Sequence, residues 1–214
     1  MVTRFEEIVQ TVTVASFILL VTASSAFAGP ATEAIKRTHA KVLEVLHDKE
    51  LNKPEGAADR KERLSMAIAE RFSYTDMARH ILARQWSVLG EEKKYAFVHL
   101  FRQILLRTYL HHIDRYTDQH VEYLEERLEF GRALVRTKVI AREREVLLDF
   151  WLFEESGDWK VYDVVVEGVS LIQNYRGQFT RALRIFSYAD IFEKMRETAC
   201  IPGCDAQTAL RPSQ

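Results

Sequence analysis

Apolar residues recur at helical spacing through the first part of the chain. The segments 31–48 and 57–71 repeat them at intervals of four and seven, as in Ile35, Val42 and Leu46 of the first segment. This pattern predicts two amphipathic helices. A loop containing Pro54 and Gly56 separates them. Residues 73–86 begin with capping residues and predict a third helix, which ends before Gly90.

The most regular helical pattern covers residues 91–114. Two glutamates stand in its first turn and two histidines in its last, and both pairs complement the helix dipole. Large apolar side chains form one stripe, at Phe97, Phe101, Ile104, Leu105 and Tyr109. Two closing helices are predicted over residues 170–185 and 188–198.

The period changes from helical to alternating after His120. Apolar residues then keep even spacing, and reversals are expected at Gly131, at 142–144 and at 156–158. Residues 121–167 therefore predict a four-stranded antiparallel meander. The alternation assigns one apolar face to Leu124, Leu128, Val135, Val139, Leu148, Phe150, Leu152, Val161 and Val165. It assigns the opposite face to Trp151, Phe153, Tyr162, Val164 and Val166, and a register error of one residue would exchange the two faces.

These elements predict an α+β fold in which a helix-rich domain packs on the four-stranded antiparallel sheet and encloses an apolar cavity. The helix stripe and the sheet face supply more large apolar side chains than a core of this size needs, which leaves room for a cavity, although such a stripe is more often plain core. Plain core packing is the alternative interpretation. No repeat or second domain is visible, so the domain is expected to span residues 29–199.

The first 28 residues have the features of a signal peptide. Residues 11–21 are apolar but too short to span a bilayer, and Ala26-Phe27-Ala28 has the small-x-small form of a cleavage site. The mature chain is expected to begin at Gly29 after export. Residues 200–214 are expected to be disordered, with Cys200 and Cys204 either joined in a small disulfide or present as two thiols.

Charge and motifs exclude several classes of function. The chain has 30 basic and 31 acidic residues, and this balance disfavours a nucleic-acid partner. No phosphate loop, nucleophile elbow or metal-binding pair is present. A cluster of potential metal ligands is better interpreted as the solvated end of a helix, and it comprises His111, His112, Asp114 and His120.

Two carboxylates stand inside strands between apolar neighbours, at Asp149 and Asp163. A carboxylate in such a position needs partners or has a raised pKa, and some small isomerases place a general base in this way. The alternative is a structural carboxylate bonded to backbone amides or to an arginine such as Arg176.

The sequence WKVYDVVVEGVSLIQNYRGQF at residues 159–179 resembles the signature of the MlaC family, the toluene-tolerance auxiliary proteins. The similarity continues upstream through FSYTDMARHILARQW and AFVHLFRQILLRTYLHHIDRY, although Ala83 stands where relatives often have glycine. The resemblance implies a non-enzymatic periplasmic carrier without cofactor that binds a phospholipid by its acyl chains. Its implied partners are an outer-membrane lipoprotein complex and an inner-membrane ABC transporter with an MCE-domain protein. Some similar proteins belong to hopanoid systems, so another lipid, or a small periplasmic enzyme with Asp163 as base, is the alternative.

The converging stripe and face predict the residues that would contact the lipid: Phe97, Phe101, Leu105, Tyr109, Val135, Val139, Leu148, Phe150, Leu152, Val161, Val165, Leu171 and Tyr175. Arg176 is a candidate for binding the headgroup, because a guanidinium can donate paired hydrogen bonds to a phosphate. The competing hypothesis is a salt bridge from Arg176 to Asp163 or Glu167.

Overall fold

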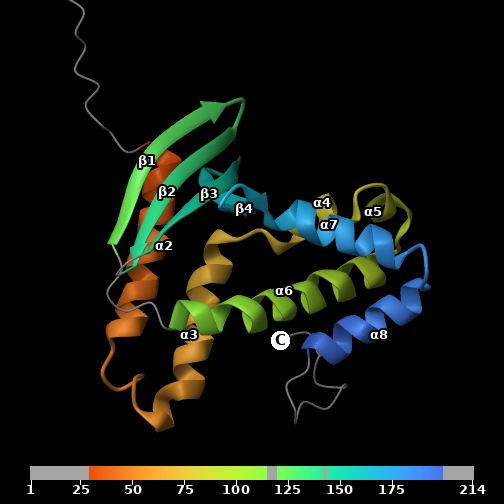
Figure 1. Ribbon diagram of the computed structural model, residues 1–214, viewed down its shortest axis with the longest axis horizontal. Coiled ribbons are helices and arrows are strands. Elements are labelled where there is room, and N and C mark those ends of the chain that lie inside the picture. Colours follow the sequence, from red (N-terminus) through yellow and green to blue (C-terminus); the bar gives the residue numbers. More distant parts are fainter. Residues whose placement is uncertain (1–28, 115–119, 142–143, 200–214) are drawn as a thin grey trace, which may run out of the picture.

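The computed structural model describes residues 29–114, 120–141 and 144–199 (Figure 1). The expected signal peptide and the tail with Cys200 and Cys204 lie outside the described residues. Within the described ranges, none of the helices combines the length and the apolar character needed to cross a bilayer.

Helices make up most of the described chain. The predicted helices over 31–48, 57–71, 91–114, 170–185 and 188–198 are confirmed with small shifts of their ends. The observed helices are α2 (Pro30–His47), the 3-10 turn η1 (Pro54–Gly56), α3 (Ala57–Arg71), α4 (Tyr74–Leu82), α5 (Arg84–Val88), α6 (Glu91–Asp114), α7 (Leu171–Ala182) and α8 (Tyr188–Ala199).

The single helix predicted over 73–86 is wrong, because the chain breaks at Ala83. Ala83 has φ 49° and ψ −118°, a backbone conformation that suits glycine and strains any residue with a Cβ. The break ends α4 and starts α5, and the Cβ of Ala83 makes it energetically costly. A glycine at this position would adopt the same conformation without strain.

The sheet has five antiparallel strands in the order β1-β2-β3-β4-β5, not the four predicted. The strands are β1 (His120–Glu129), β2 (Arg132–Ala141), β3 (Arg144–Glu155), β4 (Asp158–Val166) and β5 (Val169–Ser170). The added strand follows a tight turn at Glu167 and Gly168, which both have positive φ. The chain therefore reverses once more, and Val169 and Ser170 pair with Val166 and Val165.

A register shift in β4 changes which of its side chains share a face with β3. Val161 pairs with Leu152, but Val164 pairs with Phe150, so Tyr162 is an extra residue in the ladder. Val164 and Val166 consequently lie on the same face as Phe150 and Leu148. The predicted assignment of Val164 and Val166 to the opposite face is wrong, and so is the placement of Val165 on the face of Phe150, because the bulge moves the alternation by one residue.

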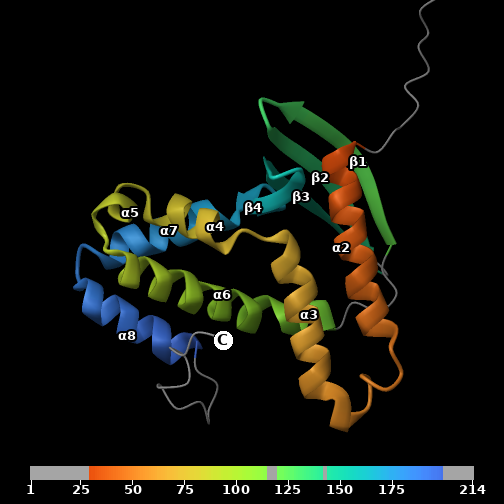
Figure 2. The same ribbon diagram turned by 180° about the vertical axis from the view of Figure 1, so that it is seen from behind.

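Figures 1 and 2 show the helices and the sheet from two opposite sides. Three apolar clusters hold these elements together. The first joins α4, α6, α7 and α8 into a helical layer beside the sheet. The second packs the start of α2 on the sheet through Ala31, Ala34 and Val135. The third joins the end of α2 to α3 and α6 through Leu46, Leu64 and Leu110.

Candidate functional site

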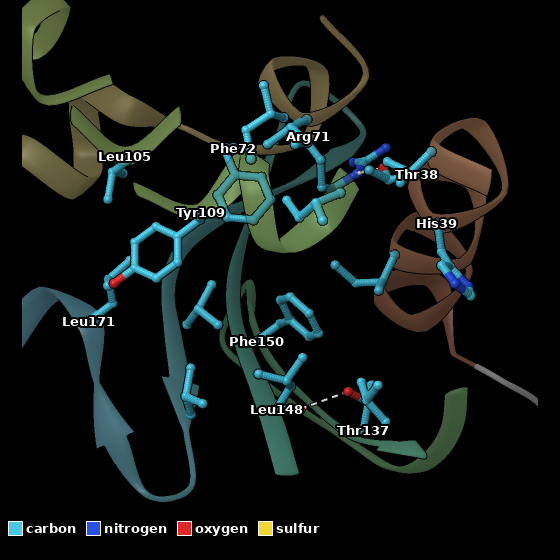
Figure 3. Close-up of a pocket in the computed structure, with 18 of the residues that line it drawn as sticks. Thr38, His39, Arg71, Phe72, Leu105, Tyr109, Thr137, Leu148, Phe150 and Leu171 are labelled. Atoms are coloured by element: carbon cyan, nitrogen blue, oxygen red, sulfur yellow. Dashed lines mark hydrogen bonds between the residues drawn. The ribbon is translucent and has the colours of Figure 1, made fainter. Parts of the chain in front are cut away.

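An apolar cavity of about 430 Å³ lies between the three clusters (Figure 3). Its floor is the inner face of the sheet, with Leu148 and Phe150 from β3. The helices α2 and α3 form one wall, and Leu105 and Tyr109 of α6 form the facing wall. Its volume is in the range of small-molecule binding sites.

The structure brings six of the predicted contact residues into this lining: Leu105, Tyr109, Val139, Leu148, Phe150 and Leu171. The other predicted residues lie elsewhere. Phe97, Phe101 and Tyr175 pack within the helical layer. Val135, Leu152 and Val161 are fully buried beneath α2. Val165 pairs with Asp149 on the opposite face of the sheet.

Sequence reasoning missed the wall that α2 and α3 contribute. This wall consists of Ile35, Thr38, His39, Val42, Ile68 and Arg71. Positions 35, 38, 39 and 42 form one helical stripe, but Thr38 and His39 are polar, and a stripe alone does not show whether it faces packed side chains or a cavity. Val164 and Val166 were missed because of the bulge in β4.

Polar groups around the cavity are bonded to one another, which leaves mainly carbon facing the interior. Thr137 donates its hydroxyl hydrogen to the carbonyl of Leu148 at 2.8 Å, so its methyl group remains free for apolar contacts (Figure 3). Thr38 accepts a hydrogen bond from Nε of Arg71 at 3.1 Å. Burial lowers the pKa of His39, which favours the neutral imidazole beside the cavity. The lining therefore suits an uncharged apolar ligand.

Arg71 links three elements around the cavity. Its side chain is 3% exposed and donates to Asp158 Oδ1 at 2.7 Å and to the carbonyl of Trp159. Burial raises the pKa of Asp158, but hydrogen bonds from Arg71, from the Trp159 amide and from Lys160 outweigh this effect and bring it to about 2. The guanidinium is thus fixed by α2 and β4 together and keeps α3 against them.

The cavity reaches solvent beside the C-terminal half of α6. Two of its lining residues are more than a third exposed, namely Tyr109 and Val166, at 38% each. The Tyr109 hydroxyl interacts with Tyr175 of α7, and burial together with this neighbour raises the pKa of Tyr175 to about 12. Tyr109 therefore lies at the opening, where a ring with a hydroxyl group suits the boundary between an apolar interior and water.

A second, more polar pocket of about 380 Å³ lies next to the cavity and shares Phe72 and Tyr74 with it. Arg102 and Lys160 contribute positive charge to this pocket, and Arg102 lies over the Tyr74 ring at 5.7 Å. Burial raises the pKa of Tyr74 to about 12, against the opposing charge of Arg102. The two aromatic rings separate the apolar cavity from this polar pocket.

Asp163 has a structural partner set. Its carboxylate accepts hydrogen bonds from the Ser170 hydroxyl at 2.6 Å and from the Ile172 amide at 3.1 Å, at the N-terminus of α7. The expectation of a carboxylate bonded to backbone amides is confirmed. Among the described residues, no ion pair joins Arg176 to Asp163 or to Glu167, so the hypothesis of this salt bridge is wrong. Arg176 is exposed, and Glu167 accepts a hydrogen bond from the Leu147 amide. Neither Asp163 nor Arg176 lines the cavity.

We expect Asp163→Ala to lower the free energy of unfolding by about 2 kcal/mol, because it removes two hydrogen bonds from a carboxylate at a helix N-terminus. Thermal unfolding followed by circular dichroism should show a decrease in Tm of roughly 4–8 °C. Asp149→Ala is the matched control, since Asp149 makes only a 3.4 Å ion pair with half-exposed Arg136. Asp149→Ala should lower the free energy of unfolding by less than about 1 kcal/mol. Equal decreases in the two variants would contradict the role of Asp163 in capping α7.

The candidate metal cluster at the end of α6 is only partly described. The side chains of His111, His112 and Asp114 lie outside the described residues. Among the side chains that are described, no group of three histidines, cysteines or acids is arranged to hold a metal ion.

Comparisons with known proteins agree with the fold. The MlaC protein family matches over residues 36–197, and the search of the curated proteins finds no match. Among solved structures, the chain is similar to a phospholipid-binding protein from Ralstonia solanacearum in complex with a phospholipid. The TM-score is 0.72 with 22% identity, over 80% of this chain and 97% of that one. Since the family match spans most of its length, the chain belongs to the MlaC protein family.

Proposed function

We propose that this protein is a periplasmic carrier that holds a phospholipid by its acyl chains and moves it between membrane complexes. The observation that carries the proposal is the apolar cavity between α2, α3, α6 and the sheet. The phospholipid bound by the Ralstonia solanacearum protein of similar fold supports the identity of the ligand.

An unfilled cavity of this size is costly to a folded protein. The lining is almost entirely apolar, and apolar surface that is left in contact with water costs about 25 cal/mol per Å². Apolar ligand atoms would cover this surface. The cavity is therefore best explained as a binding site that is normally filled.

The chemistry of acyl chains fits this lining. Each methylene removed from water contributes about 0.8 kcal/mol, and two ordinary chains contain on the order of 30 methylenes. Spontaneous release into water would be very slow. Release then requires a partner that binds the lipid more favourably, and no catalytic group is needed. The expected partners are an outer-membrane lipoprotein complex and an inner-membrane ABC transporter with an MCE-domain protein.

The test is to identify what the protein contains after purification from its own cells. We expect native mass spectrometry to show protein with bound lipid, and extraction with organic solvent to yield a phospholipid. Transfer is then measured by mixing the loaded protein with vesicles, with and without the reconstituted MCE-domain transporter. Faster lipid transfer in the presence of the transporter is the expected result.

Each alternative gives a different result. A hopanoid in the extract would replace phospholipid as the cargo and keep the carrier function. Protein that is folded and free of lipid, and that takes up none from vesicles, would contradict the carrier function itself.

A further inference from the structure

A carboxylate on the covered face of the sheet lies against the first turn of α2. Glu126 in β1 pairs with Val135, so its side chain shares the face that α2 buries. One oxygen, Oε2, accepts a hydrogen bond from the Thr32 amide at 2.7 Å. The other oxygen, Oε1, is buried and has no hydrogen-bond partner among the described residues. A buried acceptor without a donor is destabilising, which suggests that a donor is missing.

Gly29 lies directly against this unpaired oxygen. A Cβ added to Gly29 would overlap Oε1, so this oxygen lies next to the Cα of Gly29. The nitrogen of Gly29 is one bond of about 1.46 Å from that Cα. In the unprocessed chain this nitrogen is a neutral amide with one hydrogen. A free α-ammonium at the same place would have three donors and a positive charge.

We propose that cleavage between Ala28 and Gly29 creates this ammonium, and that it forms a buried ion pair with Glu126. Water hydrolyses the peptide bond: the Ala28 carbonyl carbon takes the oxygen and leaves as a carboxylate with residues 1–28, while the Gly29 nitrogen takes protons to become the ammonium. The small-x-small sequence Ala26-Phe27-Ala28 suits a signal peptidase. The inference rests on the export in the proposed function.

The ion pair would connect processing to the cavity. Helix α2 supplies one wall of the cavity, and its first turn is held to β1 by Glu126. The ammonium adds a second bond from the same carboxylate to the same turn. The precursor lacks this bond, so the wall would reach its full stability only after the leader is removed. A less stable precursor is also easier to keep unfolded for export.

The test combines protein mass with a double-mutant cycle. Intact mass spectrometry of exported protein should give a chain that begins at Gly29. Adding Ser-Gly before Gly29, or replacing Glu126→Gln, should each lower the Tm by roughly 4 °C. The variant with both changes should have the same Tm as either single variant, because both changes break the same ion pair. Glu129→Gln, an exposed acid on the same strand, is the control and should leave the Tm unchanged.

A mature chain that begins at another residue would overturn the proposal. So would variants whose Tm does not fall, or whose decreases in Tm simply add in the double variant. If Glu126→Gln fails to fold, the Ser-Gly extension alone decides, because it leaves the carboxylate intact. Lipid content is measured in parallel by native mass spectrometry. Absence of lipid from correctly processed wild-type protein would count against the carrier function and not against the ion pair.

Discussion

Replacing Val164 with lysine is expected to remove bound lipid from the protein. Val164 lies on the cavity face of β4, paired with Phe150. A lysine there would place an ammonium among apolar side chains, where a lipid chain cannot hydrate it. Excluding water from an unpaired charge costs several kcal/mol, and each 1.4 kcal/mol is a tenfold change in affinity. We expect lipid occupancy in native mass spectra to fall at least tenfold.

The neighbouring residue provides a matched control. Val165 pairs with Asp149 on the opposite face, so Val165→Lys adds the same charge to the same strand, next to an acid. This variant should retain its lipid. Leu148→Trp is a neutral second variant that fills the cavity with carbon and should also displace lipid. Lipid loss in Val165→Lys with full occupancy in Val164→Lys would mean that the other face of the sheet binds the lipid.

The helices could be predicted from sequence because their apolar period is long and regular. The break at Ala83 could not, since alanine favours helix and nothing in the sequence requires its positive φ. The fifth strand was missed although a signal existed. Glu167-Gly168 repeats the residue-glycine pattern of the turns at Phe130-Gly131 and Ser156-Gly157, and all six residues have positive φ.

The candidate site was predicted only in part because one stripe can serve two environments. The stripe on α6 is continuous in sequence, yet Phe97 and Phe101 pack against α7 and α8, whereas Leu105 and Tyr109 line the cavity. A 24-residue helix is about 36 Å long, so its two ends meet different neighbours. The faces predicted for the end of β4 are wrong for another reason. The bulge at Tyr162 adds one residue to the strand, so the side chains that follow it point to the opposite faces from those expected.

Arg71 is a position at which a single substitution should strongly destabilise the fold. Its guanidinium joins α3 to Thr38 of α2 and to Asp158 and Trp159 of β4. Arg71→Met keeps much of the side-chain volume but leaves the Trp159 carbonyl and the Asp158 carboxylate without their donor. We expect a loss of about 3 kcal/mol in the free energy of unfolding, or roughly 6–12 °C in Tm. Arg63→Met, at an exposed position on the same helix, should change it by less than about 0.5 kcal/mol.

The same interaction predicts an acid-dependent loss of stability. The pKa of Asp158 is about 2 in the folded protein and 3.8 as its ordinary value. A lowered folded pKa contributes stability that is complete above pH 3.8 and is lost as the pH falls towards 2. Urea unfolding at several pH values should show this loss in the wild type. In Arg71→Met the Asp158 pKa should rise towards its ordinary value, so the loss between pH 4 and pH 2 should become smaller. If Arg71→Met loses as much stability between pH 4 and pH 2 as the wild type does, Asp158 owes its low pKa to the Trp159 amide and Lys160. Arg71 would then stabilise the fold mainly through Thr38 and the Trp159 carbonyl.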